Sequence, residues 1–415
     1  MVKLLHGFTS WVVRVYSQKK PEIPAFEESL IPQETGKDKT KEELKNLELK
    51  FHEQQSELKK VKEELEKYKA AKEGYLPLSE PVVKDITEAE TRKIYIDTLL
   101  REAGWDPYGK NVREYSIKNC IPQADKSLGD GFADYVLWGD NGKPLAVVEA
   151  KRTARDKDTG REQARLYANG LERDFGQRPI VFYSNGYETD IWDDTHYPPR
   201  NVFGFYTKDE LELLIQRRTS KKSLASETIN LAITERPYQQ EAIRRVAEAL
   251  ERKQRDALLI MATGTGKTRV AASIVDFLSK ANWAKRVLFL ADRIPLVEQA
   301  KKSFNECLPN LPGVNLVEEK EDDSSRIVFS TYQTLINLID GETDGDNRLY
   351  GVGHFDVIIF DEIHRSVYNR YKAIFKYFDG IRIGLTATPK TETSKDTYEL
   401  FGMEANNPTF AYELD

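Results

Sequence analysis

The chain has 415 residues, enough for about two or three domains, and its 40% content of hydrophobic residues can supply more than one core. Its net charge of -6 excludes an overall basic character, so a nucleic-acid partner would have to bind at local patches or clefts. The two cysteines lie far apart without metal-ligand spacing, which argues against a disulfide framework or a zinc site and favours a reducing compartment, by default the cytoplasm.

Residues 1–37 form an N-terminal segment whose role the sequence does not reveal. Its apolar run is interrupted by Arg14, is too short for a membrane span, and is not followed by a small-residue cleavage site. We therefore expect a strand or amphipathic helix that packs on another element, and no membrane partner.

Residues 38–73 are rich in Lys, Glu and Gln, and their apolar residues fit the a and d positions of heptads except at Gln54. No Gly or Pro interrupts the run, so we expect a helix of roughly 50 Å at about 1.5 Å per residue. A coiled coil that docks on a partner or on a second copy is the functional interpretation, and a solvated connecting helix is the alternative. Pro77 and Pro81 end the helix.

Residues 82–215 form a second unit in which helices and strands alternate. The pattern predicts a helix at 84–103, strands at 112–117, 131–138 and 145–149, a helix at 160–175 and a strand at 179–184. The charged residues 216–230 are interpreted as a linker. From 231 to 398, apolar strands alternate with amphipathic helices, which predicts a parallel sheet covered on both faces.

Three side chains of the second unit are arranged for metal-dependent hydrolysis. Asp134 lies in one predicted strand, and Glu149 and Lys151 share one face of the next, so a hairpin brings the three together. Two carboxylates can hold Mg²⁺ against a scissile phosphate, while the lysine activates water or stabilises the developing charge. Exposed residues that serve no site are the alternative for this pattern alone.

A phosphate-binding loop lies between a short apolar strand at 257–260 and a helix-compatible run at 270–275. Its glycines let backbone N–H groups approach phosphate oxygens, Lys267 can reach the β and γ phosphates, and Thr268 can hold Mg²⁺. The residues assigned to nucleotide binding are Thr263, Gly264, Thr265, Gly266, Lys267 and Thr268.

A buried strand further along, at 357–360, is followed by polar residues that complete a nucleotide site. Asp361 can hold Mg²⁺ through water, Glu362 can orient and activate the attacking water, and His364 can couple the site to neighbouring motifs. At this distance after a phosphate-binding loop, the pattern predicts nucleotide hydrolysis.

The spacing and surroundings of Asp134, Glu149 and Lys151 resemble the core of PD-(D/E)xK nucleases. Gln163 and Tyr167 repeat the Gln-x-x-x-Tyr helix that follows this core in the R subunits of type I restriction enzymes. The resemblance implies that both residues serve catalysis. It also implies a third carboxylate ligand for Mg²⁺ beside Asp134 and Glu149, which is Glu90 or, as a second choice, Glu88.

The second half resembles superfamily 2 helicases of the DEAD/DEAH type, with its motifs in their order. Residues 236–239 match the adenine-reading segment, in which Gln239 would hydrogen-bond the base. Residues 291–299 and 330–334 match two loops that grip the nucleic-acid backbone, and residues 386–389 match the loop that links hydrolysis to movement. Hydroxyl, amide and Arg side chains at strand ends suit phosphate contact without base recognition.

The fusion of such a nuclease to such a motor resembles the R (restriction and motor) subunit of type I restriction enzymes. The resemblance implies an α/β chain in which a PD-(D/E)xK nuclease domain precedes a RecA-like, parallel-sheet P-loop ATPase domain. It implies ATP and Mg²⁺ as cofactors, and double-stranded DNA and the modification and specificity subunits as partners. The implied activity is Mg²⁺-dependent DNA cleavage coupled to ATP-driven translocation.

Residues 399–415 resemble the start of a second RecA-like domain, whose remainder and arginine finger are not in this sequence. Because such a finger contributes about 10³- to 10⁵-fold in comparable sites, we expect nucleotide binding with weak or no hydrolysis by this chain alone. The alternatives are a stand-alone superfamily 2 helicase acting on RNA, against which Gln163 and Tyr167 argue, and a non-catalytic assembly or decoy protein.

Overall fold

The computed structural model describes residues 95–123, 127–151, 160–322, 324–341, 343–344, 347–363, 365–388 and 395–413. All of them belong to one compact unit, Lys84–Asp415. The expected N-terminal segment, the expected coiled coil and most of the expected helix at 84–103 lie outside the described residues, as do Glu88, Glu90 and His364.

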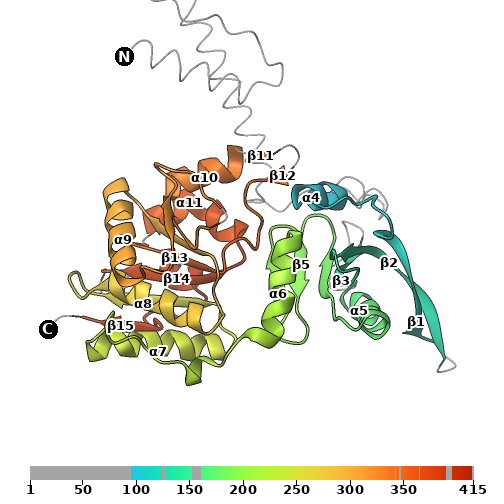
Figure 1. Cartoon of the computed structure of the whole chain (residues 1–415), viewed down its shortest axis with the longest axis horizontal. Helices are drawn as coiled ribbons and strands as arrows, with labels where there is room; N and C mark the ends of the chain where they lie inside the picture. Colours follow the sequence, from blue (N-terminus) through green and yellow to red (C-terminus); the bar gives the residue numbers. More distant parts are fainter. Residues whose placement is uncertain are drawn as a thin grey trace, which may run out of the picture. The chain divides into compact units, whose positions relative to one another are not determined.

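A six-stranded sheet forms the first part of this unit, with strand order β1-β2-β3-β4-β5-β6 (Figure 1). Its strands are β1 Arg113–Pro122, β2 Leu128–Trp138, β3 Pro144–Ala150, β4 Ile180–Ser184, β5 Thr189–Trp192 and β6 Arg200–Val202. Neighbouring strands are antiparallel except β3 and β4, which are parallel and are joined by helix α5, Arg161–Phe175. A parallel pair needs such a crossover, since a tight turn can join only antiparallel strands.

Helices cover both faces of this sheet. Val147 and Val181 pack in one apolar cluster with residues of α5, and their neighbours Val148 and Phe182 pack in another with α4, Asp97–Glu102, and α6, Lys208–Ser220. The sequences of the buried strands β3 and β4 are therefore continuous apolar runs rather than alternating ones, because both faces of the sheet are covered. At the start of α6, Thr207 and Glu210 form a capping box that fixes where the helix begins.

The second part of the unit is a seven-stranded sheet in the order β15-β7-β14-β13-β8-β10-β9, in which every pair is parallel. Its strands are β7 Asp256–Met261, β8 Val287–Ala291, β9 Gly313–Asn315, β10 Ile327–Thr331, β13 Val357–Phe360, β14 Ile381–Thr386 and β15 Phe410–Tyr412. The expected α/β class and parallel sheet are confirmed.

Two groups of helices pack on the two faces of the parallel sheet. One face carries α7 Pro237–Glu251, α8 Lys267–Lys280 and α9 Ile294–Cys307, and the other carries α10 Tyr332–Gly341, α11 Arg365–Tyr377 and α12 Lys395–Leu400. A two-stranded ribbon of β11 Thr343–Asp344 and β12 Asn347–Arg348 follows α10.

The structure differs from the sequence-based expectation at three places. Residues 399–415, expected as the start of a second RecA-like domain, include β15, which pairs with β7 in the seven-stranded sheet. Strands β5 and β6 were not predicted, because four and three residues are too few for an alternating pattern to show. The segment expected as a linker from residue 216 begins inside α6 and continues into a short 3-10 helix, Leu224–Ser226. Arg217 looked like part of a solvated charged run but is buried, 6% exposed.

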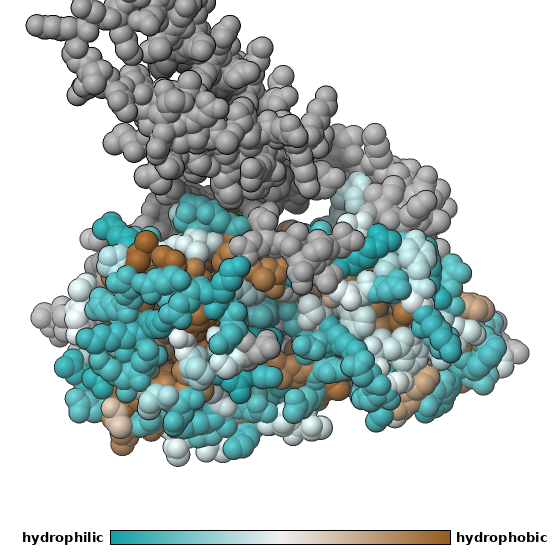
Figure 2. All heavy atoms as spheres, turned by 45° about the horizontal axis from the view of Figure 1, so that its top comes forward, coloured by the Kyte–Doolittle hydropathy of each residue, from teal (hydrophilic) through white to brown (hydrophobic). Residues whose placement is uncertain are grey.

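Among the described residues, no helix is long and apolar enough to cross a bilayer. Figure 2 shows one face of the molecule, on which hydrophilic residues cover most of the described surface and apolar residues emerge in several separate places.

Candidate functional site

Asp134 and Glu149 come from neighbouring antiparallel strands, as the hairpin predicted. Tyr135 pairs with Val148 between β2 and β3, so the next residues along, Asp134 and Glu149, stand opposite each other. Asp134 is 8% exposed and Glu149 2% exposed. The main-chain N–H of Ala150 donates to Oδ2 of Asp134 at 2.7 Å, which fixes one carboxylate at the end of β3.

A chain of polar contacts runs from Glu149 to helix α5. The ammonium of Lys151 lies 2.6 Å from Oε1 of Glu149 and donates to Oε1 of Gln163 at 3.2 Å. The amide of Gln163 in turn donates to the hydroxyl of Tyr167 at 2.6 Å. Burial raises the pKa of the Tyr167 hydroxyl above its ordinary value, so this hydroxyl, the last group in the series of contacts, stays protonated. The four residues expected to act together are therefore in contact.

Two glycines bring α5 against the strands that carry these residues. A Cβ atom on Gly131 of β2 would lie 2.5 Å from Cε1 of Tyr167, and one on Gly160, at the start of α5, would lie 3.2 Å from Cγ of Glu149. Neither glycine was among the residues predicted to serve the site. A glycine inside a strand, such as Gly131 in β2, is a usual indication of a close approach by another element.

The donor set at this site fits Mg²⁺ through two carboxylates. No group of three or more His, Cys, Asp or Glu side chains in the described part of the chain is arranged to hold a metal ion. Asp134 and Glu149 nevertheless supply the oxygen ligands that Mg²⁺ prefers, and this ion commonly keeps several waters. A bound cation would compete with the Lys151 ammonium for Oε1 of Glu149.

The phosphate-binding loop joins β7 to α8 at the carboxyl end of the parallel sheet. Gly264 and Gly266 have φ angles of 81° and 86°, in the left-handed region that only glycine adopts readily. Gly266 is the N-terminal cap of α8 and no described side chain caps this helix. The first N–H groups of α8 are thus open to an anion, and the helix dipole favours one there.

Lys267 and the carboxylates after β13 meet at this loop. The Lys267 ammonium lies 3.3 Å from Oε1 of Glu362 and 3.4 Å from the main-chain oxygen of Met261. Burial, and secondarily the charge of Glu362, raise the pKa of Asp361 to about 6. A buried carboxylate that is costly to ionise gains most from a divalent cation, so Asp361 fits a Mg²⁺ site.

The expected adenine-reading residue has a different contact in this structure. Gln239 is 4% exposed and its amide donates to the main-chain oxygen of Thr265 at 2.9 Å. The hydroxyl of Tyr238 donates to the same oxygen at 3.0 Å, and its ring stacks on Tyr412 at 3.9 Å between centroids. Tyr412, on β15, was not predicted, because nothing local in the sequence links it to a segment so far away.

The remaining helicase-like segments lie at the carboxyl ends of the parallel strands. Thr331 ends β10, and its hydroxyl accepts the N–H of Thr334 at 3.1 Å, as at the start of a helix. Arg293 follows β8 with its side chain 78% exposed. Thr386 ends β14, and its hydroxyl accepts the N–H of Thr388 at 3.2 Å.

Comparison with known proteins agrees with this architecture. A family model described as the type I restriction enzyme R protein N terminus matches residues 112–200, and one described as the type III restriction enzyme res subunit matches residues 232–391. The type I restriction enzyme EcoKI endonuclease subunit of Escherichia coli (strain K12) is 28% identical over 412 residues, which cover 79% of this chain and 34% of that protein.

Two further relatives are similar. The EcoAI endonuclease subunit of Escherichia coli is 29% identical over 368 residues, covering 81% of this chain and 43% of that protein. A solved fragment described as an HsdR subunit of a type I restriction enzyme from Vibrio vulnificus YJ016 is 27% identical, covers 79% of this chain and 59% of that chain, and has a TM-score of 0.34. The chain thus spans 34% and 43% of the length of the two curated relatives.

The fold and the matched segments define a restriction-type nuclease segment followed by a helicase-type P-loop domain. The chain is similar to the endonuclease subunits of type I restriction enzymes, and residues 112–200 match the N terminus of their R protein. The resemblance drawn from the motifs is confirmed.

Proposed function

We propose that this chain is the part of a type I restriction endonuclease that cleaves double-stranded DNA with Mg²⁺ and binds the ATP that drives translocation. The observation that carries the proposal is the contact chain from Glu149 through Lys151 and Gln163 to Tyr167. These hydrogen bonds join the end of β3 to α5, and the side chains of Glu149 and Lys151 are only 2% and 12% exposed.

Each residue has a chemical role in this proposal. Asp134 and Glu149 hold Mg²⁺, which supplies Lewis acidity at the scissile phosphate. Lys151 stabilises the negative charge that develops there or positions the attacking water. Gln163 and Tyr167 keep the Lys151 ammonium at the site through the hydrogen bonds already described.

The second site binds Mg²⁺ and ATP in this proposal. The phosphates lie on the loop at residues 263–268, with Lys267 as their cation, and Thr268 and Asp361 hold the metal ion. Glu362 orients the attacking water. Residues 291–299 and 330–334 contact the DNA backbone, and residues 386–389 link hydrolysis to movement. A separate specificity subunit reads the recognition sequence, and the modification subunit is a further partner.

The test of the nuclease assignment is plasmid cleavage in Mg²⁺ by Lys151→Ala and by Lys118→Ala. Both lysines are paired with a carboxylate at 2.6 Å, but Lys118 is 68% exposed and pairs with Asp130 at the far part of the β1–β2 hairpin. We expect Lys151→Ala to lose cleavage by about 100-fold or more, and Lys118→Ala to keep it. Equal cleavage by the wild-type chain and Lys151→Ala, or cleavage in EDTA, would contradict the assignment of this nuclease site.

A further inference from the structure

Two buried carboxylates next to strands of the parallel sheet form ion pairs with arginines from the six-stranded part of the chain. Asp356 directly precedes β13 and is paired with Arg217 of α6, through Nη2 to Oδ2 at 2.7 Å and a second contact from Nη1. Both side chains are 7% exposed. A bidentate pair of this kind fixes orientation as well as distance.

Asp379 lies two residues before β14 and has three partners. Arg200 of β6 donates from Nε to both of its carboxylate oxygens, at 2.9 and 2.8 Å, and the hydroxyl of Tyr206 donates to Oδ2. Arg255, directly before β7, donates from Nη2 to Oδ1 at 2.9 Å. Burial acts to raise the pKa of Asp379, yet Arg200 and Arg255 hold it well below its ordinary value.

These contacts lie at the amino ends of the strands whose carboxyl ends carry the nucleotide site. The strand after Asp356 leads to Asp361 and Glu362, and the strand after Asp379 leads to Thr386. The strands are adjacent and parallel, and each is only about 13–20 Å long at roughly 3.3 Å per residue. A short, fully hydrogen-bonded strand transmits a displacement of one end to the other.

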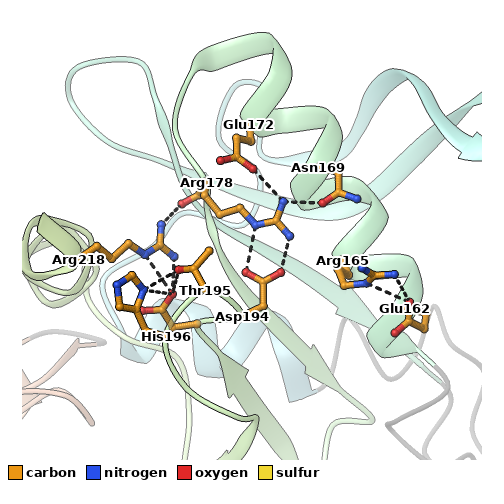
Figure 3. A network of polar contacts seen from close by, with 10 residues as sticks. Glu162, Arg165, Asn169, Glu172, Arg178, Asp194, Thr195, His196 and Arg218 are labelled. Atoms are coloured by element: carbon orange, nitrogen blue, oxygen red, sulfur yellow. Dashed lines mark hydrogen bonds and ion pairs between the residues drawn. The ribbon is translucent and has the colours of Figure 1, made fainter. Parts of the chain in front are cut away.

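The α6 helix is held on its other side by the six-stranded sheet. Arg218, the residue after Arg217, donates to Oδ1 of Asp193 at 2.8 Å and to the main-chain oxygen of Arg178. Figure 3 shows the contact of Arg218 with Arg178 beside the pair of Arg178 with Asp194, in which Nε donates to Oδ1 at 3.0 Å. The adjacent residues Arg217 and Arg218 thus form ion pairs on the two sides of α6, one toward each sheet. The helix therefore cannot shift freely relative to either sheet.

We propose that Arg200 and Arg217 are positioning residues of the nucleotide site: through Asp379 and Asp356, the nuclease part fixes the strands that present Asp361, Glu362 and Thr386. This inference rests on the proposed function of the phosphate-binding loop. It makes the nuclease part a support for nucleotide binding, in addition to its own chemistry.

The test uses the complete 415-residue chain with Arg200→Gln, Arg217→Gln and the double variant. These changes leave no carboxylate without a partner, since Asp356 still accepts the N–H groups of Lys285 and Arg286, and Asp379 still binds Arg255. The matched control is Arg178→Gln, because Arg178 pairs with Asp194 within the six-stranded part, where Nε donates to Oδ1 at 3.0 Å and the arginine side chain is 11% exposed. That pair includes neither Asp356 nor Asp379.

Two measurements are made on each variant: the Kd for Mg·ADP by calorimetry, and amide hydrogen exchange of residues 357–360 and 381–386 without nucleotide. We expect the double variant to raise the Kd about 3- to 30-fold and to speed exchange in both strands, with the control within about twofold. Unchanged Kd and exchange, or an equal change in Arg178→Gln, would overturn the inference. A wild-type chain that binds no Mg·ADP would instead overturn the proposed nucleotide site, and the exchange rates would still decide the positioning role.

Discussion

The ammonium of Lys267 and the carboxylate of Glu362 form an ion pair, with 3.3 Å between Nζ and Oε1. One residue begins α8 and the other follows β13, so the pair joins the two segments that a nucleotide would touch. Glu362 has a φ angle of 51°, in the left-handed region that residues other than glycine adopt only at a cost. Backbone strain of this kind is common at functional sites.

Replacing Lys267 with alanine should weaken Mg·ATP binding by about 10- to 100-fold, because a charge-assisted hydrogen bond contributes about 1.5–3 kcal/mol. Calorimetric titration of the purified chain measures the Kd. The matched control is Lys280→Ala, at the other end of the same helix, where the side chain is 46% exposed and paired with Asp276. Equal Kd values for the wild type and Lys267→Ala would show that the phosphates bind elsewhere.

Changing Asp361 to asparagine should stabilise the fold at pH 8 and have little effect near pH 4. The pKa of Asp361 in the folded chain is about 6, against an ordinary value of 3.8. The native state therefore binds this proton more tightly than the unfolded state, and wild-type stability falls as pH rises through this window. The gain at pH 8 should be at most about 3 kcal/mol, from about 1.36 kcal/mol per pH unit.

Urea unfolding of the wild type and Asp361→Asn at both pH values measures this difference. The same variant should weaken Mg·ATP binding, since a neutral amide is a poorer ligand for Mg²⁺. A stability difference that is the same at pH 4 and pH 8 would contradict the ionisation argument.

Adding one methyl group at Gly131 should destabilise the six-stranded part of the chain. The new Cβ would lie 2.5 Å from Cε1 of Tyr167 and 2.9 Å from Sγ of Cys120, so buried groups on α5 and on β1 must shift. We expect a loss of about 1–3 kcal/mol, as for other overpacked cores. Gly204→Ala is the control, because its Cβ would meet only ordinary contacts, the nearest at 3.7 Å. Thermal unfolding that ranks the two variants in the opposite order would argue against the close packing described.

Sequence patterns were sufficient for the elements that carry the two sites. The strands that hold Asp134 and Glu149 were predicted because two apolar runs, at residues 131–138 and 145–149, lie close enough in sequence to form a hairpin. The loop at 261–268 was predicted because its glycines and Lys267 follow a strand and precede a helix. In each case the information is local, within one strand, turn or helix.

The parts that were missed depend on distant partners. Arg217 and Arg218 have the composition of a solvated linker, and only their partners Asp356 and Asp193 bring them into buried contacts. Tyr412 reaches the loop through strand pairing with β7 across a long stretch of chain. Periodicity and motif spacing do not encode such pairings, so the contact between the two sheets could not be predicted.

The proposal that Asp134 of β2 and Glu149 of β3 hold Mg²⁺ for DNA cleavage rests on two buried carboxylates on adjacent strands. It is tested most directly by comparing plasmid cleavage by Glu149→Gln and Asp130→Asn in Mg²⁺. Both carboxylates are paired with a lysine at 2.6 Å in the same sheet, but the Glu149 side chain is 2% exposed and that of Asp130 is 42% exposed. We predict that Glu149→Gln loses Mg²⁺-dependent cleavage while Asp130→Asn cleaves like the wild type. Cleavage by Glu149→Gln at the wild-type rate would contradict the account.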